Sequence, residues 1–127
     1  MIEKFNLQEK VDGVTEFFQY LRIGTLNDHM LNVLQAENRT LPFHIHEDSD
    51  EMFYCIEGSF AIEFDDGLTP LSAGDAIIIP KGTRHRPVCK EPVKCLLIER
   101  AGTLDASNTG GTYQAPNKWE HPYENTV

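Results

Sequence analysis

The sequence predicts an all-β protein, either a sandwich of two sheets or a closed barrel. After Gly13, no stretch of the 127-residue chain keeps the spacing of apolar residues that an amphipathic helix needs. Instead, short runs of β-branched and aromatic residues alternate with turns that contain glycine, proline, asparagine or aspartate. Short strands with regularly spaced turns are typical of sandwiches and barrels.

The first 14 residues carry a short helical signal. Asn6 is a candidate N-cap, because Glu9 follows three residues later as in a capping box. Gly13 marks the expected end of the helix. We therefore expect a short helical turn ahead of the first strand.

The expected strands follow this turn in chain order. They are predicted at residues 17–23, 30–36, 41–46, 51–57, 59–64, 68–71, 76–79, 85–89 and 93–100. Asp65-Asp66-Gly67 predicts a tight hairpin, because an Asp-Gly pair tolerates positive φ. Residues 101–127 are rich in small and polar residues and predict an irregular tail. The chain length predicts one domain, residues 1–127, with a barrel core at about 25–100.

Charge and composition narrow the range of partners. The chain has 20 acidic and 11 basic residues, a net charge of −9 and a pI near 4.9, which disfavours nucleic acid and anionic membranes as partners. No apolar run reaches the length of a membrane span, and the N-terminus lacks the regions of a signal peptide. Three cysteines without metal-knuckle spacing (Cys55, Cys89 and Cys95) predict reduced thiols in a cytoplasmic protein.

The stretch from His44 to Glu51 predicts a metal site. In an extended strand, side chains at i and i+2 share a face, so His44 and His46 should project together. Glu51 opens the next apolar run after a turn, so its carboxylate can face back toward the two imidazoles. Two nitrogen donors and a carboxylate suit a divalent transition metal. His85, in a separate downstream turn, could complete the set.

Two motifs resemble those of the cupin superfamily. Residues 44–58 read His-x-His-x4-Glu-x6-Gly, and residues 74–85 read Gly-x5-Pro-x-Gly-x2-His. The chain resembles a group of small single-domain bacterial cupins, which are often labelled only as cupin-domain or mannose-6-phosphate-isomerase-like proteins. It departs from the motifs at Asn38, where the first opens with glycine, and at Cys89, where the second closes with asparagine.

The resemblance implies a double-stranded β-helix of the jelly-roll type with one metal site. His44, His46, Glu51 and His85 would be ligands of one divalent transition metal ion inside the barrel, which could be Fe, Mn, Ni, Cu or Zn. It also implies a small-molecule ligand in the barrel and a homodimer. An outward apolar set needs burial against N-terminal strands or a second subunit, and consists of Phe43, Ile45, Met52, Tyr54 and Ile56.

Other side chains have structural interpretations. Arg86 follows His85, so strand alternation should turn it away from the metal. His29 lies beside a turn and should face solvent, and His121 lies in the predicted tail. Residues 47–50 are expected to form a solvated loop. Expected core or pocket residues are Phe53, Cys55, Phe60, Ile62, Phe64, Ile77, Ile79 and Leu97.

Three functions stay open at this point. The first is a mononuclear metal enzyme of the oxygenase type that acts on a small organic substrate. The second is a metal-assisted sugar isomerase or epimerase, although no basic side chain is expected beside the ligands to hold a phosphate. The third is a non-catalytic domain that binds or senses a small ligand. The sequence identifies no catalytic acid or base, and it leaves open whether Asn32 and Gln35 reach the pocket.

Overall fold

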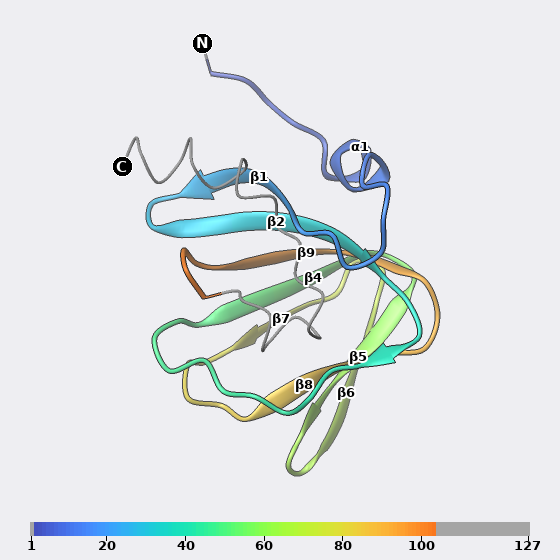
Figure 1. Ribbon diagram of the computed structural model, residues 1–127, viewed down its shortest axis with the longest axis vertical. Coiled ribbons are helices and arrows are strands. Elements are labelled where there is room, and N and C mark those ends of the chain that lie inside the picture. The colour runs from blue at the N-terminus through green and yellow to red at the C-terminus, as the bar shows by residue number, and fades with distance from the viewer. Residues whose placement is uncertain (1, 104–127) are drawn as a thin grey trace.

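The computed structural model describes residues 2–103, which form two antiparallel sheets packed face to face (Figure 1). The first sheet has the order β1 (Leu21–Leu26), β2 (His29–Ala36), β9 (Val93–Arg100), β4 (Glu51–Glu57), β7 (Ala76–Ile79). The second has the order β3 (Arg39–Thr40), β8 (His85–Cys89), β5 (Ser59–Phe64), β6 (Gly67–Ser72). The predicted all-β jelly-roll fold is confirmed, and residues 104–127, including His121, lie outside the described part.

The helical turn lies where the sequence predicts it. Helix α1 (Leu7–Asp12) begins after Asn6, whose side chain accepts a 2.9 Å hydrogen bond from the Glu9 backbone N–H. Gly13 caps its C-terminal end. The helix is short because a capping residue and a glycine lie only seven positions apart in the sequence.

The segment around α1 covers the outer face of the first sheet. Val11 and Val14 pack against Val33 of β2 and Leu96 of β9, away from the space between the sheets. The Gln35 side-chain amide donates hydrogen bonds of 2.9 and 3.1 Å to the Val11 and Val14 carbonyl oxygens. Gln35 therefore ties the N-terminal segment to the sheet and does not reach the barrel interior.

The main core lies between the two sheets. Alternate residues of the strands point inward, and each predicted core residue belongs to this cluster, with Phe64 and Ile77 at its partly buried margin. The three cysteines are free and buried, and burial raises the pKa of each thiol. They are therefore protonated core side chains, as the sequence predicts.

Two predicted strands differ from the structure. Residues 17–20 are not part of β1, because Phe18 has a φ of +64°, outside the extended region. Residues 41–46 form no regular strand, and within them only His44 makes a β-bridge, to His85. Pro42 lacks a backbone N–H and so cannot donate to a ladder in this segment. The pair Arg39–Thr40, which lies between two of the predicted strands, forms the short strand β3 on β8.

Gly58, between β4 and β5, shows why glycine is needed at one corner of the barrel. Its φ is +86°, and a Cβ atom at this position would lie 2.5 Å from the Pro92 carbonyl oxygen. Asn38 takes the place of the glycine that opens the first motif, and it has a φ of +44°. Asparagine tolerates this left-handed conformation, so the departure from the motif leaves the turn intact.

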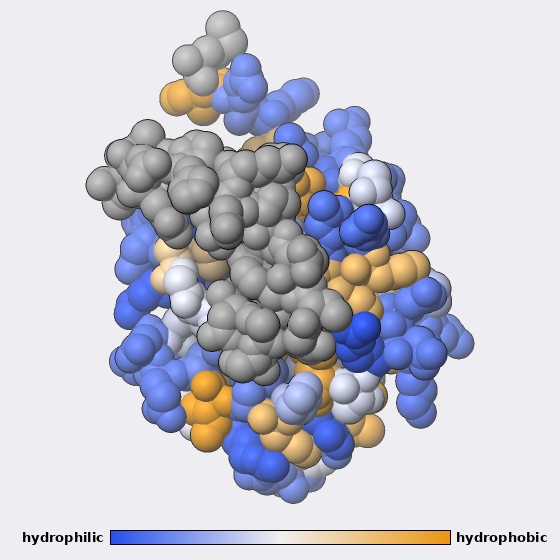
Figure 2. Space-filling view, viewed as in Figure 1, coloured by the Kyte–Doolittle hydropathy of each residue, from blue (hydrophilic) through white to orange (hydrophobic). Residues whose placement is uncertain are grey.

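The surface is largely hydrophilic. Blue residues cover most of the described surface visible in Figure 2, in line with the charge of the chain. Of the predicted outward apolar set, Tyr54 and Ile56 pack beside the N-terminal segment, whereas Ile45 is 44% exposed. The homodimer and the cytoplasmic location stay predictions. Within residues 2–103, no helix is long and apolar enough to cross a membrane.

Candidate metal centre

Three imidazoles meet at one end of the barrel. His44 and His46 lie in the loop before β4, and His85 is the first residue of β8. Their ring centroids are 4.9 Å (His44–His46), 4.6 Å (His44–His85) and 5.5 Å (His46–His85) apart. One ligand nitrogen from each lies within 4.8 Å of the others, so the group could hold a metal ion.

Backbone hydrogen bonds, not strand alternation, bring these histidines together. The backbone N–H of His44 donates to the His85 carbonyl oxygen at 2.9 Å, and the reverse bond measures 3.0 Å. The Gly82 N–H donates to the His46 carbonyl oxygen at 2.8 Å. The loop of residues 41–46 is therefore fastened to the turn before β8, and both histidines face the same point as His85.

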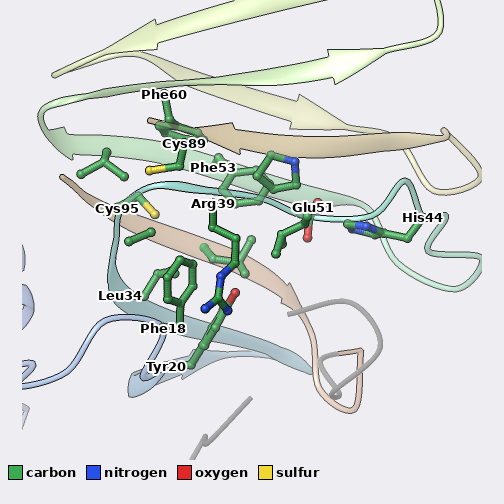
Figure 3. A pocket seen from close by; sticks show the side chains of 15 residues that line it. Phe18, Tyr20, Leu34, Arg39, His44, Glu51, Phe53, Phe60, Cys89 and Cys95 are labelled. Carbon is green, nitrogen blue, oxygen red and sulfur yellow. The ribbon is translucent and has the colours of Figure 1, made fainter. Parts of the chain in front are cut away.

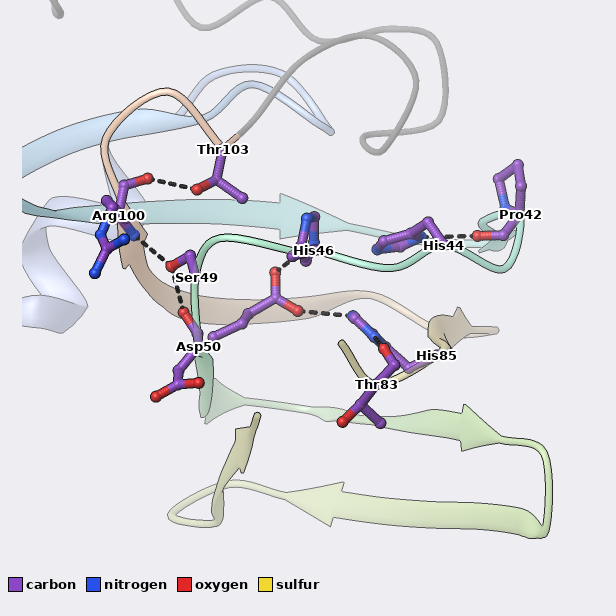
Figure 4. Close-up of polar contacts among 10 residues, drawn as sticks. Pro42, His44, His46, Ser49, Asp50, Thr83, His85, Arg100 and Thr103 are labelled. Atoms are coloured by element: carbon purple, nitrogen blue, oxygen red, sulfur yellow. Dashed lines mark hydrogen bonds and ion pairs between the residues drawn. The ribbon is translucent and has the colours of Figure 1, made fainter. Parts of the chain in front are cut away.

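Two of the rings are oriented by backbone carbonyls (Figure 4). The Nδ1 of His44 lies 2.9 Å from the Pro42 carbonyl oxygen, and the Nδ1 of His85 lies 2.8 Å from the Thr83 carbonyl oxygen. A carbonyl oxygen only accepts, so each Nδ1 carries the proton and Nε2 is left to face the centre. Metal-binding histidines are commonly fixed in this way.

Glu51 joins the histidines from the first position of β4. One carboxylate oxygen lies 2.8 Å from the Nε2 of His85, and the other lies 3.3 Å from the Nε2 of His46. The side chain is buried, with 3% exposure. The structure thus brings together all four residues for which the sequence predicts ligands.

The electrostatics of the metal-free group follow from these contacts. Burial opposes the charge of Glu51, but hydrogen bonds from His46 and His85 outweigh it and lower its pKa to about 2. Burial also opposes the charge of His85, yet its hydrogen bonds with Glu51 and Thr83 raise its pKa. Burial lowers the pKa of His44. A divalent transition metal needs the carboxylate and neutral imidazoles as donors, so an ion would take the place of the proton that Glu51 favours on His85. These residue types fit such an ion.

Glu99 is a further acidic residue at this centre that the sequence did not single out. It lies on β9 directly opposite Glu51 in the strand register, and its side chain has 0% exposure. Oxygen atoms of Glu99 and Glu51 and a nitrogen of His46 lie within 4.8 Å of one another. Burial, and then the charge of Glu51, raise the pKa of Glu99 well above its usual range. The sequence did contain a signal for Glu99: residues two positions apart on a strand share a face, and Leu97 on the same strand was expected to point inward.

A mostly apolar pocket opens beside the centre (Figure 3). Its cavity volume is about 40 Å³, room for a few water-sized groups. Arg39 is its basic member, with the guanidinium carbon 4.0 Å from the centroid of the Phe18 ring. The sequence singled out no basic side chain for a pocket, and Arg39 is one of the lining residues. The lining consists of Phe18, Tyr20, Leu34, Ala36, Arg39, Leu41, His44, Glu51, Phe53, Phe60, Pro87, Cys89, Val93, Cys95 and Leu97.

The remaining polar candidates lie outside the centre or at its margin. Asn32 is buried on β2, on the inward side of the strand between Met30 and Leu34. Arg86 faces away from the histidines and pairs with Glu63 at 2.7 Å, as predicted.

The loop before β4 is less exposed than the sequence suggested. Ser49 is buried, because its hydroxyl donates to the Asp50 carbonyl oxygen and accepts from the Arg100 backbone N–H. These bonds fix the loop between the histidines and Glu51 against the end of β9. His29, by contrast, is partly exposed and contacts Asp28 at 2.8 Å.

Together, the fold and this group of side chains define a small jelly-roll protein with histidine and glutamate residues that could hold a metal ion. The cupin domain family matches residues 31–99, and the chain belongs to this family. The uncharacterized protein YdbB of Bacillus subtilis (strain 168) is 39% identical over 82 residues, which cover 64% of this chain and 72% of YdbB.

Two solved structures have similar folds. The crystal structure of a cupin-2 domain containing protein from Shewanella frigidimarina NCIMB 400 matches with a TM-score of 0.71 and 32% identity, covering 76% of this chain and 93% of that protein. Protein NMB1881 from Neisseria meningitidis matches with a TM-score of 0.68 and 25% identity, covering 78% of this chain and 100% of that protein.

Proposed function

We propose that the chain is a mononuclear metal-dependent enzyme that acts on a small, largely apolar organic acid. His44, His46, Glu51 and His85 hold one divalent transition metal ion. The observation that supports this proposal is the continuity between the ligand group and the apolar pocket, because His44 and Glu51 belong to both. A molecule in the pocket therefore lies next to the ion.

The pocket residues bind and orient the substrate. Apolar walls such as Phe53, Phe60 and Leu97 exclude water and hold an apolar body. Arg39 pairs with an acidic group of the substrate, because its guanidinium presents five hydrogen-bond donors. When bound, Fe(II) or a similar ion supplies Lewis-acid or dioxygen chemistry.

The lining favours the oxygenase type over sugar chemistry. The hydroxyl groups of a sugar would need several hydrogen-bonding partners, and this mostly apolar lining offers few. A substrate without hydroxyl groups would leave fewer of its own polar groups unpaired. A metal-assisted isomerase or epimerase is therefore the second candidate, and a non-catalytic binding domain is the third.

The metal is tested first, by elemental analysis of the purified protein after loading with Fe(II), Mn(II) or Zn(II). We expect one ion per chain in the parent and in His29→Ala, a control histidine outside the centre. His44→Ala and Glu51→Ala should lose most of the metal. Full occupancy in both of these variants would contradict the proposed ligand set.

The reaction is tested next, with the Fe(II) protein and a panel of small aliphatic acids, which suit a cavity of about 40 Å³. Dioxygen uptake that is lost in Arg39→Gln would support the oxygenase type and the acidic substrate. Turnover of sugars by the Zn(II) protein without oxygen would favour the isomerase. Tight binding of an acid without any turnover would favour the binding domain and contradict the enzyme proposal.

A further inference from the structure

Glu99 is a buried carboxyl group that accepts no hydrogen bond from residues 2–103. Its side chain has 0% exposure, and neither of its oxygen atoms has a hydrogen-bond partner within residues 2–103. Burying a polar group without hydrogen-bond partners costs free energy whether or not it is ionised, so native proteins nearly always pair such groups or place them on a metal. The position of Glu99 therefore requires an explanation.

The neighbours of Glu99 on the sheet do not explain its burial. In the strand register, β9 places Glu99 between Met30 of β2 and Glu51 of β4. A thioether offers no proton, and Glu51 and Glu99 would repel each other if both were ionised. Arg22, the buried cation on the neighbouring strand β1, directs its guanidinium to the sulfur of Met30.

A cation between Glu99 and Glu51 would give the Glu99 oxygen atoms a partner and would offset the repulsion between two ionised carboxylates. Oxygen atoms of Glu99 and Glu51 and a nitrogen of His46 lie within 4.8 Å of one another, close enough for one ion to contact all three. His46 also belongs to the group of three histidines, so both groups share a ligand. The two groups therefore adjoin at His46.

We propose that Glu99 is an additional ligand of the metal centre, which then has three imidazole and two carboxylate donors. This inference rests on the proposed function, because it assumes that the histidines hold the ion. Two carboxylates balance the charge of a divalent cation, and hard oxygen donors favour Mn(II) or Fe(II) over softer ions. Five protein donors would leave room for one outside ligand on a six-coordinate ion.

The experiment compares metal binding by Glu99→Gln and by the matched control Glu47→Gln. Both variants lose one carboxylate, and Glu47 follows His46 in the chain, but its side chain is exposed. We expect Glu99→Gln to weaken Mn(II) binding about tenfold or more, measured by calorimetry, and to change the visible absorption of the Co(II) protein. Glu47→Gln should match the parent in both measurements.

Unchanged Mn(II) affinity and an unchanged Co(II) spectrum in Glu99→Gln would overturn the inference. Glu99→Asp, which keeps the charge but withdraws the carboxylate by one methylene, provides a second test and should also bind Mn(II) more weakly. The metal-free Glu99→Gln protein should melt at about the temperature of the parent, because glutamine has nearly the shape of the protonated carboxyl group that burial favours at this position. If His44→Ala loses the metal while Glu99→Gln keeps parental binding, only this inference fails. If His44→Ala keeps the metal, the proposed function fails as well.

Discussion

Glu51→Gln should flatten the pH dependence of stability in the metal-free protein. In the folded chain, the pKa of Glu51 is lowered to about 2 from 4.5, so its carboxylate stabilises the fold above pH 4.5. This contribution is lost as the pH falls from 4.5 toward 2. The difference between these two pKa values corresponds to about 3 kcal/mol in the free energy of unfolding.

The same substitution acts at the other end of the pH range through His85. Its hydrogen bond with Glu51, at 2.8 Å, helps to raise the pKa of the imidazole above 6.5. A raised pKa contributes stability that is fully present below pH 6.5 and is lost as the pH rises through the folded-state value. In Glu51→Gln, which lacks this carboxylate, we expect less stability to be lost as the pH rises.

Urea unfolding in the presence of a chelator, from about pH 3 to about pH 8, measures both effects. Glu63→Gln is the matched control, because it removes a carboxylate from the partly exposed pair with Arg86, where the cost is at most about 1 kcal/mol. The reasoning would be refuted if the stability of Glu51→Gln fell as steeply as that of the parent at both ends of the pH range.

Two further pairs of substitutions test the fold. Gly58→Ala should lower the free energy of unfolding by about 3 kcal/mol, because a positive φ and the close Pro92 carbonyl both oppose a Cβ atom. Gly74→Ala has a similar φ but open space, so it should cost about 1–2 kcal/mol in the same denaturation experiment, and equal losses would exclude the clash. Ile62→Ala, with 0% exposure, should cost about 2–5 kcal/mol, whereas Ile78→Ala, with 66% exposure, should stay within about 0.5 kcal/mol; similar thermal unfolding curves for these two would contradict the core assignment.

Most strands could be predicted from the sequence because their signals are local. Inward and outward residues alternate between turns from Glu51 onward, so β4, β5, β7, β8 and β9 have the predicted bounds. The strand predicted at residues 41–46 was wrong because the conformation of this segment depends on a partner that is distant in the sequence. His44 is held by backbone hydrogen bonds to His85, and nothing in the local pattern specifies that contact.

The same holds for the candidate site: residues in a local motif were predicted, and a residue placed by a distant contact was missed. The spacing of His44, His46 and Glu51 is a local motif, and it was sufficient to predict residues that the structure brings together. Arg39 enters the pocket because its short strand pairs with β8, which the sequence pattern did not indicate. Glu99 could have been found, since strand alternation already placed Leu97 inward two residues earlier.

The central claim is that side chains from separate β-segments bind one ion at the end of the barrel. Anomalous diffraction from a metal-loaded crystal, recorded at the absorption edge of the ion, tests this claim most directly. We predict one strong peak per chain within about 2.3 Å of an imidazole nitrogen of His44, His46 and His85 and of a carboxylate oxygen of Glu51. A fully loaded crystal whose peak lies away from these atoms would contradict it.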